Sequence, residues 1–516
     1  MPAPDLRLWS RSGSRQYRWW GFAGTALVGV GALGAGALSH QDPYVGLPLV
    51  GTLRQLPGLA AGLVFAGLAV LVLAWLRLGR SLPAPRELAG TLVWWSAPLL
   101  AVPPLFSRDA YSYLAQGAMF DRGIDPYHFG PAALGGHLAA DIPQIWQHTP
   151  APYGPVFLAV AAVAIRFAGD HPVIALLALR LLVVAALGLL ARCVAEMALR
   201  CAVDPARALW LGVVNPLVIA HLVGGIHNDA LMITLMAAGL LLVLRGQRIL
   251  AVLVLTLAVL VKAPAAAALL FVVPAWAAAM AGRWRPARAA SAVITVAVTA
   301  TVAVTWLLGS GYGWVQALGT PTVVRNGMSL STNAGMILGW LPQRLGLATV
   351  DTAVATTRVG GLLAVVAVTA LVWWHRDRLN PVTAAGLVLT AVVVLGPVVH
   401  PWYLLWGLVL LAAGTTHWLA RRGLVAVSVG LVFSLQPMGA SPQPADVVAA
   451  IVGVTVVVVA AVTPRWLAAW RLSSAPLPAE KPGPQAPVAE TVPSALATEL
   501  AREPLPVVAP QLSRSS

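Results

Sequence analysis

The sequence predicts an all-α polytopic membrane protein, built as a bundle of about 14 transmembrane helices with two long external loops. Three observations lead to this fold class. Of the 516 residues, 59% are hydrophobic and only 10% are charged, whereas charged residues make up about 25% of a soluble domain. Apolar stretches of spanning length recur along the chain. The arginines between them fall on one side of the membrane. A soluble enzyme, a disordered chain and a disulfide-stapled secreted domain are thereby excluded.

Each transmembrane helix needs about 20 mostly apolar residues. The stretches that meet this requirement lie near residues 19–39, 57–76, 88–105, 172–191, 207–224, 227–245, 248–262, 264–281, 289–308, 355–373, 381–399, 401–420, 423–438 and 447–465. With these spans, the arginine clusters, such as Arg283, Arg285 and Arg288, lie on the same side as both termini. Because positive residues mark the cytoplasmic face, we expect both termini to be cytoplasmic.

The apolar stretch 152–168 is an exception. If it crossed the bilayer, the arginines between residues 192 and 207 would fall outside, against the positive-inside rule. We therefore expect it to form an interfacial or re-entrant helix, which is allowed where protein covers its exposed backbone groups.

These assignments divide the chain into parts that alternate between membrane and solvent. The parts are a cytoplasmic N-terminal segment (1–18), the first three transmembrane helices (19–105), an external loop with the interfacial helix (106–171), further transmembrane helices (172–308), a second external loop (309–354), the C-terminal transmembrane helices (355–465) and a cytoplasmic tail expected to be disordered (466–516). The net charge of +15 suits contact with anionic lipid. Nucleic acid is not an expected partner, because the arginines are scattered in short clusters between apolar spans.

The first external loop opens on the motif FSRDAYSY, which places an acid and a base beside two tyrosines. The carboxylate of Asp109 can act as a general base on a hydroxyl outside the membrane. Tyr111 and Tyr113 can pack against sugar rings and hydrogen-bond to them. The alternative is an ion pair between Arg108 and Asp109 that only orders the loop.

Further polar residues of the two loops are weaker candidates. Asp125 and Tyr127 belong to the motif GIDPY, and Tyr153 precedes the expected interfacial helix. Glycine and proline around these residues also fit purely structural turns. In the second loop, Arg325 and Asn326 can hold a phosphate or a sugar, or can simply be solvated.

The motif GGIHND lies in a very short outer connection between two apolar spans and contains His227, Asn228 and Asp229. Three consecutive polar residues at a bilayer edge cost several kcal/mol unless they are paired or solvated. They indicate either a site or a polar clamp between two helices. Lys262, the only lysine among the spans, can bind an anion such as phosphate or can snorkel to the interface from a helix end.

The motif HPWY marks another tight outer connection and contains His400, Trp402 and Tyr403. Tryptophan and tyrosine are common interface anchors, so the aromatic residues alone do not indicate a site. The candidates from these separate segments nevertheless share the outer side of the membrane, which favours a cavity open to an extracytoplasmic acceptor.

The motifs FSRDAYSY, GIDPY, GGIHNDALM and HPWYLLW resemble those of the actinobacterial polyprenol-phosphomannose-dependent α-(1→6)-mannosyltransferases, within the GT-C glycosyltransferase superfamily. The resemblance extends over about residues 15–470. It implies a GT-C-type bundle in a bacterial inner (plasma) membrane with an extracytoplasmic active site. It further implies inverting transfer of mannose from polyprenyl-phosphate-mannose to a mannan or lipomannan acceptor, with an α-(1→6) linkage, no required cofactor and no catalytic metal.

The resemblance also suggests roles for the candidate residues. Asp109 would be the general base, and Asp229 would be a reserve base or would orient the sugar. Stabilisation of the leaving phosphate would fall to Lys262, Arg325 or Arg108, while His227 and Asn228 would orient sugar hydroxyls and His400 and Tyr403 would line the cavity near the phosphate.

Two alternative functions remain open. A GT-C transferase that uses another lipid-linked sugar would share these motifs. A lipid or sugar transporter or flippase also keeps a few membrane charges, but such proteins usually have internal repeats and place their charges near the midplane of the bilayer. This sequence shows no repeat between its halves, and its charges cluster at the outer edge.

Overall fold

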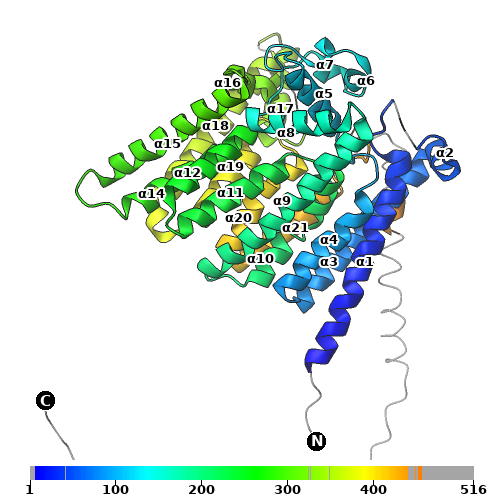
Figure 1. Ribbon diagram of the computed structural model, residues 1–516, viewed down its shortest axis with the longest axis horizontal. Coiled ribbons are helices and arrows are strands. Elements are labelled where there is room, and N and C mark those ends of the chain that lie inside the picture. The colour runs from blue at the N-terminus through cyan, green and yellow to red at the C-terminus, as the bar shows by residue number, and fades with distance from the viewer. Residues whose placement is uncertain are drawn as a thin grey trace, which may run out of the picture. The chain divides into compact units, whose positions relative to one another are not determined.

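A computed structural model describes residues 6–439, apart from residues 41, 43, 324, 326 and 348, together with residue 448 and residues 451–455. Within this part of the chain every regular element is a helix, which confirms the all-α class (Figure 1). The predicted tail at 466–516 and most of the last predicted span at 447–465 lie outside the described residues.

Four described helices are long and apolar enough to cross a bilayer on their own. They are α3 (Pro57–Ser81), α9 (Pro172–Arg200), α15 (Arg285–Leu308) and α18 (Val350–Trp374). A fifth candidate is the pair formed by the π-helix η3 (Val218–Gly224) and α11 (Asp229–Leu244), bent by 114° at the break between them. Several apolar helices thus agree with a membrane protein, while the number of about 14 spans stays a prediction.

The span predicted at 19–39 coincides with the 30-residue helix α1 (Leu6–Ala35). Most other predicted spans coincide with helices that are shorter or interrupted, namely α4 (Pro85–Ser96), η1 (Ala97–Leu99), α10 (Pro205–Gly212), α12 (Arg248–Val261), η4 (Ala263–Ala265), α13 (Ala266–Leu270), α14 (Val272–Ala277), α19 (Pro381–Leu395), η7 (Pro401–Tyr403), α20 (Leu404–Gly414) and α21 (Trp418–Val432). Many start at a proline, which lacks a backbone N–H and therefore suits the first turn of a helix but not its interior. Two short elements, α2 (Pro48–Gln55) and η6 (Arg376–Arg378), connect longer ones.

The two segments predicted as long external loops are mostly helical. They contain α5 (Asp109–Asp121), η2 (Pro131–Ala133), α6 (Gly136–Ala140), α7 (Gln144–Gln147), α8 (Pro155–Ala168), α16 (Gly313–Gln316), η5 (Ala317–Val323) and α17 (Leu330–Arg344). Helices pair the backbone groups that a long irregular loop would leave without partners. At the start of α17, for example, the Ser329 side chain accepts a hydrogen bond from the Thr332 N–H.

Helix α8 is the segment predicted as interfacial or re-entrant. Its 14 residues make a helix of about 21 Å, shorter than the hydrocarbon core of about 30 Å. Proline begins the helix, and Gly169 ends it in the left-handed conformation. Helix α5 packs closely on it, because a Cβ at Gly117 would lie 2.6 Å from the carbonyl carbon of Ala161. The interfacial placement itself stays a prediction.

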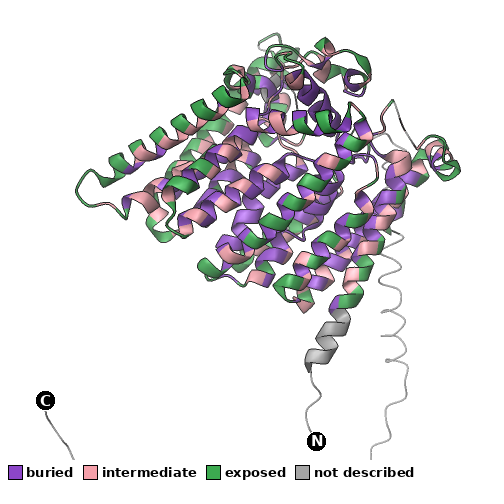
Figure 2. Ribbon diagram, in the orientation of Figure 1, coloured by how far each residue is buried: buried purple, intermediate pink, exposed green. Residues whose placement is uncertain are grey.

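Burial differs sharply between the helices (Figure 2). Every residue of α20 is buried, and the neighbouring helices α10 and α11 are also largely buried. Helices α15 and α18 are apolar but mostly exposed, which is the pattern of a helix surface in contact with lipid tails. In Figure 1, α5, α6, α7 and α16 gather at the same end of the helices α9 to α12, and this end carries the candidate site.

Candidate active site

One cavity of about 610 Å³ brings together residues from six separate parts of the sequence. It is lined by helix α5, the segment from α7 to Tyr153, the break between α12 and η4, η5, helix α18, and the segment from α19 into α20. Among the predicted site residues, it exposes Asp109, Tyr153, Lys262, His400 and Tyr403. The carboxylate and the ammonium predicted to carry the chemistry therefore face one common space.

Asp109 begins α5, and a held turn positions it. Phe106 adopts a left-handed φ of 64°, which is unfavourable for a residue with a side chain. The turn persists because the Phe106 N–H donates to the Pro437 carbonyl at 2.7 Å and the Leu105 N–H donates to the Gly224 carbonyl at 3.1 Å. The Asp109 N–H then donates to the Ser107 hydroxyl at 3.0 Å. The carboxylate is left 34% exposed toward the cavity.

His227 is a polar neighbour of this carboxylate. Its Nδ1 lies 3.5 Å from Asp109 Oδ2, and its side chain is fully buried. Burial by itself would raise the pKa of Asp109, but the side-chain contact with His227 and the electrostatic interactions with His227 and His400 lower that pKa to about 2. The carboxyl group is therefore ionised at neutral pH, as a general base must be.

Three rings support this contact from behind. The His227 ring stacks on Trp402, with centroids 3.7 Å apart, and His400 stacks on the same indole at 4.5 Å. The Tyr113 hydroxyl lies 3.5 Å from His227 Nδ1 and donates to Asn228 Oδ1 at 3.4 Å. The stack fixes the orientation of the His227 ring, and with it the direction in which Nδ1 points toward Asp109.

Asp229 and Lys262 form a buried ion pair. The Lys262 ammonium lies 2.8 and 3.0 Å from the two oxygens of Asp229, and the Trp406 indole N–H donates to the same carboxylate at 2.5 Å. Asp229 is fully buried, whereas Lys262 keeps 11% of its side-chain surface exposed and lines the cavity. The ammonium also lies 4.6 Å from the centre of the Tyr403 ring. The pair thus presents a fixed positive group to the cavity.

The bend between η3 and α11 explains why the motif GGIHND points inward. A Cβ at Gly225 would lie 2.6 Å from the His221 carbonyl oxygen and 2.8 Å from the His227 ring, so only glycine fits. Ile226 takes a left-handed φ of 57°, and α11 then starts at Asp229. This sharp turn carries His227, Asn228 and Asp229 into the protein interior, where all three are buried.

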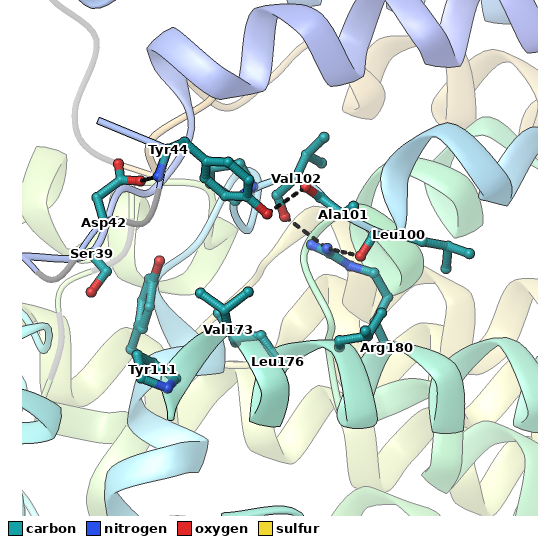
Figure 3. A pocket seen from close by; sticks show the side chains of 13 residues that line it. Ser39, Asp42, Tyr44, Leu100, Ala101, Val102, Tyr111, Val173, Leu176 and Arg180 are labelled. Atoms are coloured by element: carbon teal, nitrogen blue, oxygen red, sulfur yellow. Dashed lines mark hydrogen bonds between the residues drawn. The ribbon is translucent and has the colours of Figure 1, made fainter. Parts of the chain in front are cut away.

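Arg180 holds the two segments that carry these residues. It lies within the long helix α9 and donates to the carbonyls of Leu100 and Val102 at 2.9 and 2.7 Å (Figure 3). It also donates to the carbonyls of Val223 and Gly224, both at 3.2 Å. The small pocket beside it, about 80 Å³, is lined mostly by apolar side chains. Through these hydrogen bonds Arg180 connects the segment that precedes Asp109 with the turn that precedes His227.

Several predicted site residues lie away from the 610 Å³ cavity. Arg108 donates to the carbonyls of Asp141 and Leu38 at 3.0 and 2.9 Å. Its guanidinium therefore binds these two carbonyls, and not the Asp109 carboxylate as in the alternative of a local ion pair. The Tyr111 hydroxyl donates to the Ala37 carbonyl at 2.7 Å. Both side chains therefore bind the chain around residues 37–38 rather than the space in front of Asp109.

The weaker candidates of the two loops also lie elsewhere. Asp125 is exposed and accepts a hydrogen bond from the Tyr127 N–H at 2.8 Å, which is a local turn. Tyr127 is buried. Arg325 pairs with the exposed Asp351, and Asn326 lies outside the described residues. None of these described side chains lines the cavity.

The cavity residues that were absent from the predicted site include Ser112, Gln116, Trp146 and Trp406. Ser112 and Gln116 follow Asp109 by three and seven residues, a spacing that shares one face of a helix, so a helix prediction starting at Asp109 would have found them. Trp146 belongs to a segment with no such pattern. Among the described residues, no group of three or more histidine, cysteine, aspartate or glutamate side chains is placed to hold a metal ion.

Comparison with known proteins identifies the family. The family described as "Alpha-(1->6)-mannopyranosyltransferase, N-terminal domain" matches residues 18–278, and the family "MptB C-terminal domain" matches residues 331–463. α-(1→6)-Mannopyranosyltransferase A of Mycobacterium tuberculosis is 37% identical over 79% of this chain and 81% of its own length. α-(1→6)-Mannopyranosyltransferase B of Corynebacterium glutamicum is 34% identical over 82% of this chain and 78% of its own length. No solved structure matches. The chain therefore belongs to the α-(1→6)-mannopyranosyltransferase family and is a glycosyltransferase that transfers mannose.

Proposed function

We propose that this enzyme transfers mannose from polyprenyl-phosphate-mannose to the 6-hydroxyl of a mannan or lipomannan acceptor on the external face of a bacterial inner membrane. The observation that carries the proposal is the shared cavity, in which an ionised Asp109 and the ammonium of Lys262 face the same space. Its volume of about 610 Å³ lies in the usual range of ligand sites. The family supplies the transferred sugar and the linkage.

The reaction proceeds in a single displacement. Asp109 accepts the proton of the acceptor 6-hydroxyl while that oxygen attacks the anomeric carbon from the face opposite the phosphate. The bond from this carbon to the phosphate oxygen breaks, and the polyprenyl phosphate leaves with the bonding electrons. With the β-linked donor that the family resemblance implies, this inversion gives an α-linked product. An inverting reaction uses one base on the acceptor side, and Asp109 is the one carboxylate among the described residues that line the cavity.

Lys262 would stabilise the negative charge that develops on the leaving phosphate. Fixed positive groups aimed at developing charge are among the strongest contributions to catalysis. Asp229 would hold this ammonium in place rather than act as a base, because it is fully buried and already bonded to Lys262 and Trp406. His400 and Tyr403 line the same end of the cavity and would bound the phosphate.

The topology predicted from the arginines supports an external reaction. Basic residues such as Arg200, Arg245 and Arg248 mark the cytoplasmic ends of the helices, and the cavity opens near the opposite ends, around α5 and η7. A lipid-linked donor in the outer leaflet and a glycolipid acceptor would both reach it there.

The test is transfer by purified protein in detergent or liposomes, with polyprenyl-phosphate-mannose and a short α-(1→6)-mannoside. We expect one α-(1→6)-linked mannose to be added, and Asp109→Asn to lower kcat by at least about 100-fold. Asp204→Asn is the matched control, because Asp204 caps α10 with a hydrogen bond to the Ala206 N–H and asparagine caps equally well. Full transfer by Asp109→Asn would place the base elsewhere.

The same assay separates the two alternative functions. Transfer from a polyprenyl phosphate carrying another sugar, in preference to mannose, would favour a different lipid-linked donor. Movement of lipid or sugar across liposomes without any new glycosidic bond would favour a transporter or flippase.

A further inference from the structure

The cavity around Asp109 has two unlike walls. Helix α5 contributes a polar row of Asp109, Ser112 and Gln116, and the segment from Trp146 to Tyr153 lies beside it. Leu362 of α18 and Val392 and Val393 of α19 form an apolar part of the lining, and Lys262, Thr320 and His400 belong to the remainder. A lipid chain suits the apolar wall, whereas a hydroxyl-rich sugar needs the polar one.

Gln116 is the residue of the polar wall that lacks a partner. Its side chain is only 5% exposed, and its Oε1 has no hydrogen-bond partner among the described residues. A buried carbonyl oxygen without a donor is unfavourable, so a donor from a bound molecule would satisfy it. The close packing of α5 on α8 through Gly117 keeps the neighbouring Gln116 in this position.

The distance along α5 assigns Gln116 to a particular part of the acceptor. It follows the base by seven residues, a rise of about 10.5 Å along a helix. A group that binds Gln116 is therefore not the hydroxyl that Asp109 deprotonates. It belongs to the sugar unit behind the reacting one.

Trp146 supplies the complementary surface. It lies in α7. Two backbone hydrogen bonds stabilise this short helix: the Trp146 backbone N–H donates to the Pro143 carbonyl at 2.8 Å, and the Thr149 N–H donates to the Trp146 carbonyl at 3.2 Å. The indole lines the cavity in the same part as Thr149, Pro150 and Pro152. A site for a pyranose ring usually combines an aromatic face, on which the ring packs, with an amide that forms hydrogen bonds with its hydroxyls.

We infer that Gln116 and Trp146 form a subsite for the second sugar of the acceptor, a pyranoside unit whose hydroxyl donates to Gln116 Oε1 and whose ring packs on Trp146. The inference rests on the proposed function, because it uses Asp109 as the base that fixes where the first acceptor sugar lies. It predicts that the enzyme recognises at least two acceptor sugars.

The test compares a monosaccharide with a disaccharide acceptor, methyl α-mannoside against its α-(1→6)-linked dimannoside, in the wild type and in Gln116→Leu and Trp146→Ala. The wild type is expected to prefer the dimannoside in kcat/KM. Gln116→Leu should remove about tenfold of that preference by raising KM for the dimannoside, with kcat/KM for the monosaccharide and KM for the donor unchanged. A set of dimannosides, each lacking one hydroxyl on the second sugar, would then identify the hydroxyl that bonds to Gln116. Removing that hydroxyl should lower kcat/KM in the wild type but not in Gln116→Leu.

Two controls keep the test decisive. Gln436 is also buried, at 8% exposure, with its Oε1 unpartnered among the described residues, but it lines a different pocket; Gln436→Leu should leave the acceptor preference intact. If Gln116→Leu does not fold, Gln116→Glu takes its place as the test variant. It keeps an acceptor oxygen and should therefore keep the preference for the dimannoside. Equal losses with both acceptors, or a raised donor KM, would overturn the subsite. Absence of mannose transfer by the wild type with either acceptor would instead refute the proposed function.

Discussion

Two buried cations, Arg180 and Lys262, show how differently a membrane protein can use a positive charge. Arg180 is 1% exposed and donates to the four carbonyls of Leu100, Val102, Val223 and Gly224. Lys262 pairs with one carboxylate, keeps 11% of its side-chain surface exposed and lines the 610 Å³ cavity. The first directs four donors to backbone carbonyls, and the second has a donor left for a ligand.

The difference follows from the chemistry of the two groups. Guanidinium offers five N–H donors in a rigid plane, which suits several carbonyls at once. Ammonium is a compact point charge that shifts easily between ligands. The backbone carbonyls at Arg180 come from the turn after η1 and from the last residues of η3, whereas the carboxylate at Lys262 would be costly to bury alone. Arg180 therefore stabilises the scaffold, and Lys262 serves the reaction.

Replacing Lys262 should have the largest effect on activity. Lys262→Met removes the positive group at the phosphate, and we expect kcat to fall by about 100- to 1,000-fold. It also leaves Asp229 buried and unpaired, which destabilises a protein by about 3–5 kcal/mol. Turnover with polyprenyl-phosphate-mannose and thermal unfolding in detergent measure the two effects separately.

A second substitution distinguishes catalysis from folding at this pair. In the double variant Lys262→Met with Asp229→Asn, the buried charge disappears, so the unfolding temperature should recover most of its loss while kcat stays low. Recovery of kcat along with stability would mean that Lys262 acts only on the fold, and the contrast with Arg180 would be lost.

Replacing Arg180 should affect stability first. Arg180→Met removes the side-chain donor of four carbonyl oxygens. Gly224 keeps the bond from the Leu105 N–H, and a carbonyl left without any donor costs about 1–3 kcal/mol where water cannot reach. We expect a lower unfolding temperature and a lower yield of folded enzyme, with KM for the donor unchanged in the fraction that folds. A stable variant with lost donor binding would instead place Arg180 in the binding site.

The sequence predicted the fold class and the centre of the site for different reasons. Composition alone requires apolar helices. The cost of burying polar residues singled out Asp229, and Lys262 was singled out as the only lysine among the spans; the structure pairs the two. The number of spans could not be confirmed in the same way, because prolines and the bend at Gly225 break several apolar stretches into shorter helices. Residue spacing does not reveal such breaks.

The sequence was less informative about which residues share the cavity. Arg108 and Tyr111 stand beside Asp109 in the chain, but helix geometry turns them to the carbonyls of Leu38 and Ala37. Gln116 shares a face of α5 with Asp109, so a helix prediction could have found it, whereas Trp146 reaches the cavity from α7. The position of α7 depends on contacts far apart in sequence, which only the three-dimensional arrangement reveals.

The contact of His227 with Asp109 predicts a specific pH dependence. Burial lowers the pKa of His400 to about 4, and the pKa of Asp109 is lowered to about 2, so neither group changes charge between about pH 5 and 8. His227→Asn removes the neighbour that lowers the pKa of Asp109, so this pKa should rise and the acidic limb of kcat/KM should move to higher pH. We expect a fall in kcat of about tenfold at pH 7.

The pH profile separates this role from packing. A substitution that only loosens the ring stack, Trp402→Phe, should lower kcat less and leave the position of the acidic limb nearly unchanged. An acidic limb that does not move in His227→Asn would show that His227 does not set the protonation of Asp109.

Replacing Arg325 should have the smallest effect, although this residue was a predicted phosphate ligand. It is 45% exposed and pairs with Asp351, which is itself 79% exposed, and exposed ion pairs contribute only about 0–1 kcal/mol to stability. Arg325→Gln should therefore leave kcat and the donor KM within about twofold of the wild type. A tenfold rise in donor KM would mean that the second external segment moves Arg325 onto the phosphate during binding. In that case Arg325, which is exposed in the free enzyme, would bind the phosphate together with Lys262. The contrast between Arg180 as a structural cation and Lys262 as the catalytic cation would then be incomplete.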